Sequence, residues 1–387
     1  MMHICFICNE YPPVRHGGVG SFTQTLGRGL AANGCRVTAI GVYPIEKTIR
    51  EEDEGVSVIR LPHSLVRGTG YIINGQRLAG ELKELNRQHP IDVLDGPELS
   101  FANIRLSAPA TNVLRMNGGH HFFMTTLGQR TAIWRSWQEK RSFARANELC
   151  AVSEFVAETT RNLLKLGNRP IEILPNPVDT ERFKPRPDIS EEDGLIVFTG
   201  TLCEKKGVRQ LVQALPRIVA EVPWARLMII GRDSVDPLTG GSFKSSLKKL
   251  IQRVLKPRVE FRDFVDNSLL PETLARASVC VYPSHMEAQG IVIIEGMAMG
   301  KAVVTSRTGP GPELVEDDIS GMLCNPYDPD SIAEKVIGLL KDTQIRRQIG
   351  ARARLRAVSK FSVETLAVKN ADFYQRCVER RRMGMKE

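Results

Sequence analysis

Short runs rich in β-branched residues alternate with segments of helical period along the chain, and this alternation restricts its fold more than any other feature. Strands separated by helices in this way pair in parallel, with each helix crossing over a face of the sheet. We therefore expect parallel sheets. The expected strands include His3–Cys8, Arg36–Val42, Leu195–Thr199, Arg226–Ile230, Val279–Tyr282 and Ala302–Ser306, and the expected helices include Ser21–Asn33, Val208–Ala220, Phe243–Leu255, Ile291–Met299 and Val363–Arg382.

One segment, residues 174–194, interrupts the alternation with four prolines and an acidic cluster, and we interpret it as a domain boundary. A chain of 387 residues is also too long for one ordinary core. We predict an α/β fold of two doubly wound domains that face each other across a cleft. The predicted parts are residues 1–178, residues 179–365, and a C-terminal helix, 366–387, that crosses back to the first domain.

The composition limits the partners of the chain. Its 53 lysines and arginines against 44 aspartates and glutamates give a net charge of +9, which suits a phosphorylated substrate, an anionic membrane surface or nucleic acid. No recognisable nucleic-acid module accompanies this charge, so we expect no nucleic-acid partner. No stretch reaches the ~18 uninterrupted apolar residues of a spanning helix, so any membrane contact is expected to be peripheral.

The eight cysteines are dispersed, most of them within apolar runs, which is typical of a reducing compartment. Cys5 and Cys8 have the spacing C-x-x-C, but no second pair of Cys or His lies at the spacing of zinc ligands. We therefore expect both cysteines to pack in the core, and we expect no metal site.

Residues 283–300, PSHMEAQGIVIIEGMAMG, hold the most informative pattern in the chain. Gly290 stands where a loop is expected to turn into a helix, so Gly290 and Ile291 would present free first-turn amides to phosphate oxygens. Glu295 lies one turn further along, within reach of a ribose diol. Glu287 precedes the helix, where it can bind hydroxyls of whatever the diphosphate carries. The pattern predicts a site for a nucleoside diphosphate-sugar.

This segment resembles the E-x7-E motif of the retaining glycosyltransferases of family 4, which have the GT-B fold. Further segments resemble other motifs of that family in the same order, and the resemblance covers most of residues 1–340. It implies two Rossmann-like domains, the first binding the acceptor and the second binding the nucleotide sugar. The segments are NEYPPVRHGGVG at 9–20, LPNPVDTERFKP at 174–185, GTLCEKKG at 200–207, MIIGRD at 228–233 and VEFRDFV at 259–265.

The resemblance also implies roles for single residues. Backbone amides of the first glycine-rich loop approach the donor phosphate, and a lysine together with the amides at a helix start stabilises the departing diphosphate. A glutamate positions the transferred sugar. The implied donor-binding residues are Gly18, Thr201, Lys206, Gly231, Arg232, Gly290, Ile291 and Glu295, and the implied sugar-positioning catalytic residue is Glu287.

Two positions depart from the family pattern. Thr201 stands where the family usually has an arginine, and its hydroxyl cannot replace that charge. Lys205 either compensates for the missing charge or is a solvated lysine. The family's histidine near the transferred sugar falls on Asn117, which cannot titrate, while His120 and His121 follow shortly after. The sequence does not decide which of these three residues faces the donor sugar. Alternatively, the two histidines only fill or cap the loop.

The resemblance implies a retaining hexosyltransferase that moves a sugar from a UDP-sugar or GDP-sugar co-substrate to an acceptor hydroxyl, with no required cofactor or metal. The expected acceptor is a saccharide or a lipid-linked glycan of an envelope or polysaccharide pathway. The expected location is cytoplasmic, with at most peripheral contact with the inner face of the membrane. Two alternatives stay open: a noncatalytic protein of this fold that binds nucleotide sugars, and a sugar-nucleotide epimerase.

Two basic segments each allow two interpretations. Residues 131–147 combine four basic residues with Trp134, Trp137 and Phe143, which fits either a surface at the level of membrane headgroups or an amphipathic helix with core tryptophans. We expect at least one of these tryptophans in the core. The basic run 380–382 ends the last helix, and it is either a solvated face or an attraction for a membrane or an acceptor.

Overall fold

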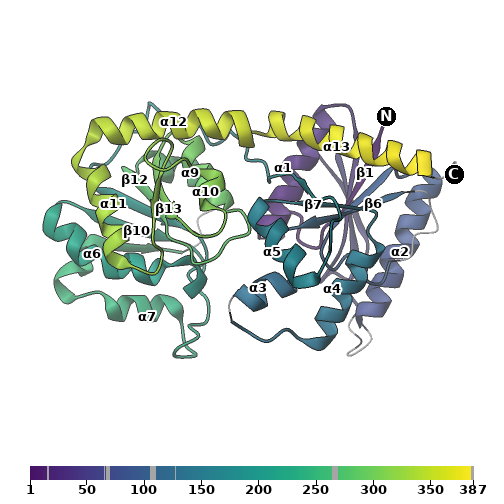
Figure 1. Cartoon of the computed structure of the whole chain (residues 1–387), viewed down its shortest axis with the longest axis horizontal. Helices are drawn as coiled ribbons and strands as arrows, with labels where there is room; N and C mark the ends of the chain where they lie inside the picture. The colour runs from purple at the N-terminus through teal and green to yellow at the C-terminus, as the bar shows by residue number, and fades with distance from the viewer. Residues whose placement is uncertain are drawn as a thin grey trace. The chain divides into compact units, whose positions relative to one another are not determined.

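The computed structural model describes residues 1–14, 17–64, 66, 70–104, 110–126, 128–263 and 269–384. The chain forms two compact units, which we describe separately (Figure 1). Unit 1 comprises Met1–Pro177 and Val363–Glu387, and unit 2 comprises Val178–Ser362. Residues 15 and 16 of the glycine-rich segment and residues 264 and 265 of VEFRDFV lie outside the described residues.

Unit 1 is built on an eight-stranded sheet with the order β3-β4-β2-β1-β5-β6-β7-β8. The chain runs outward from β1 to β2 and β4 and then returns to β5 on the other side of β1, so the sheet is doubly wound. Its strands are β1 His3–Ile7, β2 Arg36–Tyr43, β3 Ile49–Asp53, β4 Val56–Pro62, β5 Val93–Pro97, β6 Thr111–Met116, β7 Glu148–Ala151 and β8 Glu172–Ile173.

The edge strand β3 corrects the expectation of wholly parallel sheets, because it pairs antiparallel with β4. Glu54 and Gly55 join the two strands, with φ angles of 46° and 85°. Two consecutive residues with positive φ form the kind of tight turn that joins antiparallel strands. Such a hairpin needs no crossover helix, so the strand direction reverses at this edge.

Helices cover the sheet of unit 1. Phe22, Leu26 and Leu30 recur at the spacing of a helix face, and all three are buried in the core formed with β1 and β2. The last helix of the chain packs along this first helix. The helices of unit 1 are α1 Gly18–Ala32, α2 Gly70–Gln88, α3 His120–Thr126, α4 Ile133–Arg145, α5 Glu154–Leu164 and α13 Val363–Gly384.

A buried ion pair fastens α13 to the sheet of unit 1. Arg115 on β6 is fully buried, and it donates to Asp95 on β5 at 3.0 Å. The same guanidinium donates to Asn370 and to the hydroxyl of Tyr374 on α13, at 2.7 and 2.9 Å. Tyr374 in turn donates to Asp95 at 2.7 Å. Removing one partner of such a pair typically costs about 3–5 kcal/mol, so these contacts hold the last helix on the first sheet.

The C-terminal basic run also contacts unit 1. Arg380 pairs with Glu148 at 2.9 Å, and Arg381 donates to the carbonyl oxygen of Ala110. These cations are therefore used to fasten α13, an explanation that neither interpretation of the sequence contained.

Unit 2 is built on a six-stranded parallel sheet with the order β11-β10-β9-β12-β13-β14, which is the strand order of a Rossmann-type sheet. Its strands are β9 Leu195–Thr199, β10 Arg226–Ile230, β11 Val259–Arg262, β12 Val279–Tyr282, β13 Ala302–Ser306 and β14 Met322–Cys324.

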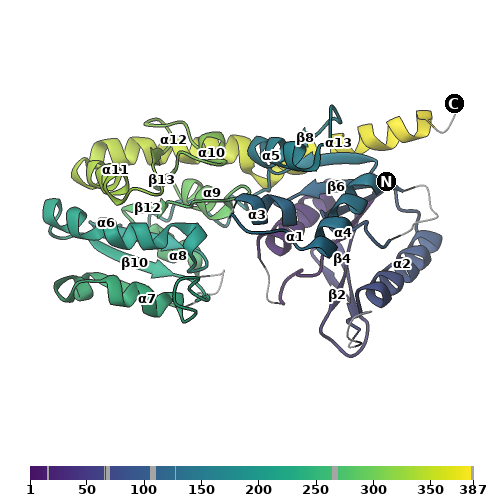
Figure 2. The same ribbon diagram turned by 60° about the horizontal axis from the view of Figure 1, so that its bottom comes forward.

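The sheet of unit 2 is covered on both faces (Figure 2). One core contains side chains of α6, α7 and α11, and a second core contains side chains of α8, α9 and α12. The helices of unit 2 are α6 Val208–Glu221, α7 Phe243–Leu250, α8 Leu270–Ala275, α9 Ile291–Ala298, α10 Gly311–Leu314, α11 Pro329–Lys341 and α12 Thr343–Phe361.

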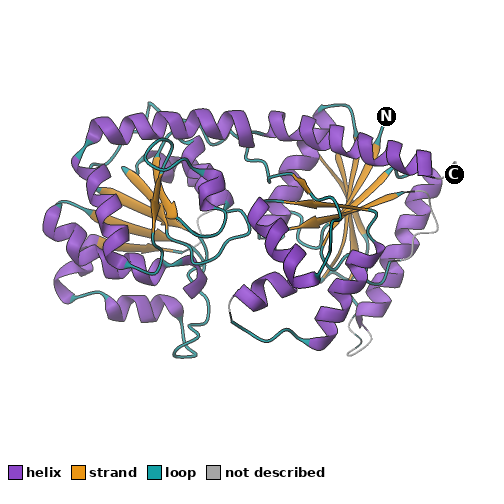
Figure 3. Cartoon of the chain, in the orientation of Figure 1, coloured by secondary structure: helices purple, strands orange, loops and turns teal. Residues whose placement is uncertain are grey.

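The doubly wound α/β fold predicted from the alternation is confirmed, since each unit has a central sheet with helices packed on it (Figure 3). One helix is shorter than expected, because α7 ends at Leu250 instead of Leu255. Residues Arg253–Arg258 form a 3-10 helix that contains Pro257. Proline has no backbone N–H and disfavours the α conformation of the residue before it, so the α-helix does not continue through this segment.

Candidate functional site

The segments that the sequence marks in unit 2 come together at the centre of its sheet. β9 and β12 are neighbours, and the strand order reverses between them. Residues 200–207 follow β9, and residues 283–290 follow β12, so both loops start at carboxyl ends of adjacent parallel strands. This is the topological switch point, where ligands of doubly wound sheets bind.

Gly207 lets these two loops touch. Its φ angle is 65°, and a Cβ atom built there would lie 1.8 Å from the carbonyl oxygen of Pro283. Next to it, the carbonyl oxygen of Lys205 accepts from the amides of His285 and Met286, at 2.9 and 3.3 Å. The loops are therefore held together through their backbones, and only glycine fits at position 207.

Lys206 and Glu287 form an ion pair across the two loops. Their side chains are 19% and 14% exposed, and Ser284 donates its hydroxyl to the same carboxylate oxygen at 3.0 Å. The cation expected to neutralise a diphosphate is thus next to the carboxylate expected to hold a sugar. An anion that bound Lys206 would compete with Glu287 for its compact ammonium charge.

Helix α9 begins three residues after Glu287. Gly290 is its N-cap, with a φ angle of 97°. Among the described residues, no group accepts a hydrogen bond from the amide of Gly290 or of Ile291, whereas the amide of Ile293 donates to the carbonyl of Gly290 at 3.0 Å. Two unused amides at the positive end of a helix can hold phosphate oxygens.

Glu295 lies one turn inside α9 and is partly buried. Desolvation raises the pKa of its carboxyl group to about 7, against a smaller opposing effect of the Arg182 guanidinium. The residue therefore titrates near neutral pH. Its ionised form has four lone-pair positions, enough to accept hydrogen bonds from both hydroxyls of a ribose.

The remaining residues predicted for the donor site in unit 2 lie along the same edge of the sheet. Gly231 follows β10, and a Cβ atom there would lie 1.7 Å from the carbonyl oxygen of Gly200. The carbonyl of Arg232 accepts from the amide of Leu202 at 2.8 Å, and Thr201 is exposed. The ends of β9 and β10 are therefore joined directly beside the loop that carries Lys206.

Gly18 is the first residue of α1 in unit 1, and an internal carboxylate occupies this helix end. Glu10 accepts from the amide of Gly17 at 3.2 Å and from that of Gly20 at 2.8 Å. A carboxylate at a helix N-terminus has the arrangement that a phosphate would use. Sequence reasoning missed Glu10, although it stands within the NEYPP segment.

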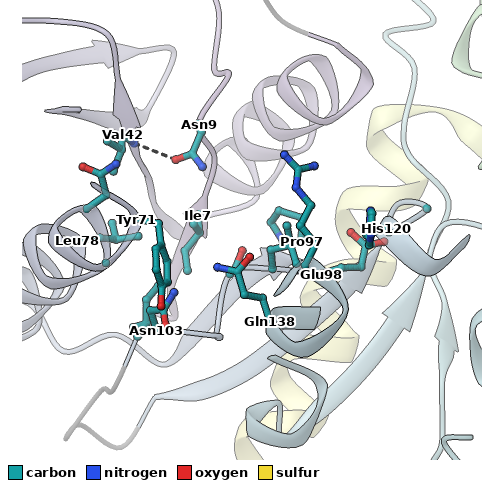
Figure 4. Close-up of a pocket in the computed structure, with 18 of the residues that line it drawn as sticks. Ile7, Asn9, Val42, Tyr71, Leu78, Pro97, Glu98, Asn103, His120 and Gln138 are labelled. Atoms are coloured by element: carbon teal, nitrogen blue, oxygen red, sulfur yellow. Dashed lines mark hydrogen bonds between the residues drawn. The ribbon is translucent and has the colours of Figure 1, made fainter. Parts of the chain in front are cut away.

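Unit 1 holds a cavity of about 760 Å³ at the carboxyl ends of its central strands (Figure 4). In Figure 4, Glu98 and His120 lie toward one end of the cavity, and Val42 and Leu78 lie toward the other. Aromatic and amide side chains, one arginine and one carboxyl group share its lining, a mixture typical of pockets that bind polar ligands. Lining residues include Asn9, Tyr71, Asn103, Phe123, Arg135 and Gln138.

The three residues left open in the loop after β6 have different surroundings. His120 lines the cavity, and its Nε2 accepts from the amide of Ala132 at 2.9 Å. Burial lowers its pKa, so the ring is neutral and carries its proton on Nδ1. Asn117 donates its side-chain amide to a backbone carbonyl, while no described residue donates to its buried Oδ1. His121 is buried and pairs with Glu139.

Helix α4 corrects the expectation of a core tryptophan in residues 131–147. Trp134 and Trp137 are 49% and 44% exposed, and they stack with ring centroids 4.8 Å apart. Ile133 is 89% exposed, and Phe143 is the buried aromatic residue instead. Tyr71, which lines the cavity, packs edge-on against Trp134 with ring centroids 5.1 Å apart, so the apolar surface of α4 lies next to the cavity.

Within the described ranges, no three His, Cys, Asp or Glu side chains are grouped so that they could hold a metal ion. Cys5 and Cys8 are both buried, in agreement with the expectation that they pack in the core. None of the helices in the described part of the chain is both long enough and apolar enough to cross a membrane.

Comparison with known proteins identifies the family. The model for Glycosyltransferase Family 4 matches residues 16–182, and the model for Glycosyl transferases group 1 matches residues 179–356. The chain belongs to glycosyltransferase family 4. The GT-B fold and the resemblance found in the sequence are thereby confirmed, and the chain is a retaining hexosyltransferase that takes its sugar from a nucleotide-sugar donor.

Three proteins illustrate what the chain is similar to, one in sequence and two in fold. The GDP-mannose-dependent alpha-(1-6)-phosphatidylinositol monomannoside mannosyltransferase of Mycobacterium tuberculosis is 28% identical over 96% of this chain and 98% of its own length. The sucrose-phosphate synthase of Thermosynechococcus elongatus superposes with a TM-score of 0.81, at 20% identity, over 97% of this chain and 99% of its own. HepE of Anabaena, in complex with UDP and glucose, superposes with a TM-score of 0.74, at 18% identity, over 97% of this chain and its whole length.

We predict that Gly207→Ala disrupts the donor site more than it disrupts the fold. The added Cβ would meet the carbonyl oxygen of Pro283 at 1.8 Å, so the two loops must separate and Lys206 must move away from Glu287. Nucleotide-sugar affinity, measured by isothermal titration calorimetry, should fall by about tenfold or more, equivalent to at least about 1.4 kcal/mol.

Gly240→Ala is the matched control. Gly240 has a similar φ angle, 70°, but open space around its Cβ position, so it adds backbone strain of about 1–2 kcal/mol without a collision. It should lower the thermal stability of unit 2 and leave donor affinity unchanged. Equal donor affinity in the two variants would show that the close approach of the loops does not matter for binding.

Proposed function

We propose that the chain transfers a hexose from GDP-hexose or UDP-hexose to a lipid-linked saccharide, with the donor bound in unit 2 and the acceptor bound in the cavity of unit 1. The observation that supports the donor assignment is the ion pair of Lys206 with Glu287. It lies three residues before the start of α9, where the amides of Gly290 and Ile291 have no acceptor among the described residues. This arrangement supplies positive charge for a diphosphate and a carboxylate for the sugar attached to it.

The proposed donor contacts follow from the chemistry of each group. Lys206 and the amides of Gly290 and Ile291 hold the diphosphate and stabilise the charge that develops as it leaves, which a metal ion does in other enzymes. Glu295, in its ionised form, accepts hydrogen bonds from the ribose hydroxyls. Glu287 exchanges its pairing with Lys206 for hydroxyls of the hexose.

Further proposed donor contacts extend this site. Gly231, Arg232 and Thr201 lie on the same strand edge and are assigned to the nucleotide side of the donor. Gly18 is assigned to the phosphate through the N-terminus of α1. A phosphate can bind there only if Glu10 releases the backbone amides of Gly17 and Gly20.

In retaining transfer, as the family is understood, an oxygen of the leaving phosphate takes the proton of the acceptor hydroxyl, so the reaction does not require a titratable side chain at the family's histidine position. Asn117 and His120 remain the two candidates for the residue that contacts the transferred sugar. Asn117 brings a buried carbonyl oxygen without a partner, and His120 brings a neutral imidazole at the cavity wall.

A lipid-linked acceptor is favoured by the surface beside the cavity. Trp134, Trp137 and Ile133 are exposed on α4, together with exposed Arg135 and Lys140. Indole rings and cationic side chains in this arrangement suit the headgroup region of an anionic membrane. The similar M. tuberculosis enzyme has a phosphatidylinositol-linked acceptor in its name. We propose that unit 1 rests on such a membrane through this surface.

We predict that Glu287→Gln lowers turnover by about 100-fold or more and changes the dissociation constant of the donor by less than about threefold. The amide cannot hold the sugar hydroxyls as a carboxylate does, but it no longer competes for Lys206, so the ground state keeps its diphosphate contact. Release of nucleoside diphosphate from GDP-mannose and UDP-glucose measures turnover, and isothermal titration calorimetry measures affinity.

Glu221→Gln, an exposed acid of α6 that pairs with Lys341, is the control and should behave as the wild type. Equal losses in turnover and affinity would reduce Glu287 to a simple binding residue. Absence of any Glu287-dependent release of diphosphate would contradict the proposed function and favour a noncatalytic binding protein, whereas interconversion of the sugar with the diphosphate linkage intact would favour an epimerase.

For the membrane contact, we predict that the wild type sediments with phosphatidylglycerol-containing vesicles and not with pure phosphatidylcholine vesicles. The double variant Ile133→Ser/Trp134→Ser should bind about tenfold more weakly, because it removes the apolar side chains that would enter the headgroup region. Trp224→Ala removes a similarly exposed tryptophan from unit 2 and should bind as the wild type. Equal vesicle binding by the two variants would show that α4 does not form the proposed membrane contact.

A further inference from the structure

Glu98 is a buried carboxyl group that belongs to no motif of the sequence, yet it lines the cavity of unit 1. It is the first residue after β5 and is 5% exposed. Its Oε1 accepts from the amide of Asn117 at 2.6 Å. Asn117 follows β6, the neighbour of β5, so the carboxyl group is fixed where the carboxyl ends of two adjacent strands meet.

At Gly119, in the loop after β6, Glu98 comes close to a second buried carboxyl group. A Cβ atom on Gly119 would lie 2.9 Å from Cγ of Glu98 and 1.9 Å from Oε1 of Glu139. Glu139, on α4, is 1% exposed, and among the residues that the structure describes none donates a hydrogen bond to this Oε1 atom. Only glycine fits between the two acids, so both acids lie against the backbone of this loop.

The basic side chains near Glu98 do not pair with it. His121 on α3 directs its Nδ1 and its amide toward Glu139, the amide at 2.9 Å from Oε2. His120 is neutral and accepts through Nε2, while Arg135 on α4 lines the cavity without a hydrogen bond to Glu98. Among the described residues, no lysine, arginine or histidine pairs with Glu98. Desolvation is the largest effect on Glu98 and, with a contribution from the charge of Glu139, raises the pKa of its carboxyl group to about 8, although the backbone amides of Glu98, Asn117 and Gly118 act in the opposite direction.

We propose that Glu98 is a further acceptor-binding residue, which works as a neutral carboxylic acid and donates a hydrogen bond to an oxygen of a saccharide in the cavity. This inference rests on the proposed function and deepens it, since it names the group that orients the acceptor. Because Oε1 accepts from the amide of Asn117, we assign the proton of the neutral form to Oε2.

The rest of the lining fits a saccharide. Asn103 and Gln138 (Figure 4) offer side-chain amides that can both donate and accept. Tyr71 and Phe123 offer apolar ring surfaces for the C–H face of a pyranose. A neutral acid among these groups donates to a hydroxyl or ring oxygen. An ionised acid could only accept, so deprotonation of Glu98 removes one acceptor contact.

The test compares wild type, Glu98→Gln and Glu98→Ala in transfer from labelled nucleotide sugar to hexyl mannoside and hexyl glucoside. The side-chain amide of glutamine replaces a protonated carboxyl group and has no charge at any pH. For the wild type, KM for the glycoside should rise about tenfold per pH unit above about pH 8, with kcat less affected. Glu98→Gln should match the wild type within about threefold near pH 7 and show a flat KM above it.

Glu98→Ala should raise KM by about tenfold or more at every pH, because it removes the donor altogether. Glu158→Gln, an exposed acid on α5 away from the cavity, is the control and should keep the profile of the wild type. Release of nucleoside diphosphate without any glycoside reports on the donor half alone. It should be the same in all variants, which shows that each one is folded and binds donor.

Three results would overturn the inference while diphosphate release persists. One is loss of glycoside transfer in Glu98→Gln near neutral pH, which would mean that the ionised carboxylate is needed. The second is an alkaline rise in KM that survives in Glu98→Gln. The third is failure of the wild type to use either hexyl glycoside, since the inference assigns a saccharide to the cavity. Absence of diphosphate release from every nucleotide sugar would instead contradict the proposed function itself.

Discussion

The contact between Gly207 and the carbonyl group of Pro283 is the constraint on which the proposed donor site depends. It brings together two loops that follow adjacent strands of one parallel sheet, and each loop carries one member of the Lys206–Glu287 pair. Helix α9 starts three residues after that pair, so a cation, a carboxylate and two unused amides occupy one sheet edge. A side chain at position 207 would separate these groups without changing any of them.

The two units offer different groups to a ligand. Unit 2 offers a paired lysine and free amides, which suit an anionic ligand with a sugar attached. Unit 1 offers a cavity with amide and aromatic walls, and its buried acids, Glu98 and Glu139, lie on either side of Gly119, where no side chain would fit. Helix α4 contributes Arg135 to that cavity while it exposes Trp134 to solvent. The same helix therefore contributes both to the wall of the cavity and to the exposed apolar surface.

Local patterns in the sequence predict the fold well, and they also single out the proposed donor loop. Alternating periods predict both doubly wound sheets, and the short segment from Glu287 to Glu295 contains its own chemistry, because a loop and the helix that follows it bring nearby residues together. Other features depend on contacts that no local pattern reports. The period of α4 does not distinguish a buried face from an exposed one, which is why the prediction of a core tryptophan was wrong. The pairing of Glu98 with Asn117 and the approach of Glu139 arise only when β5, β6 and α4 are assembled.

The most direct test of the account is a crystal structure of the protein with an intact, slowly transferred nucleotide sugar. The account predicts that the diphosphate oxygens lie on the amides of Gly290 and Ile291 and on Nζ of Lys206, with Glu287 released from that lysine and turned to the hexose. A diphosphate bound elsewhere, or an unbroken Lys206–Glu287 pair with the ligand present, would contradict it.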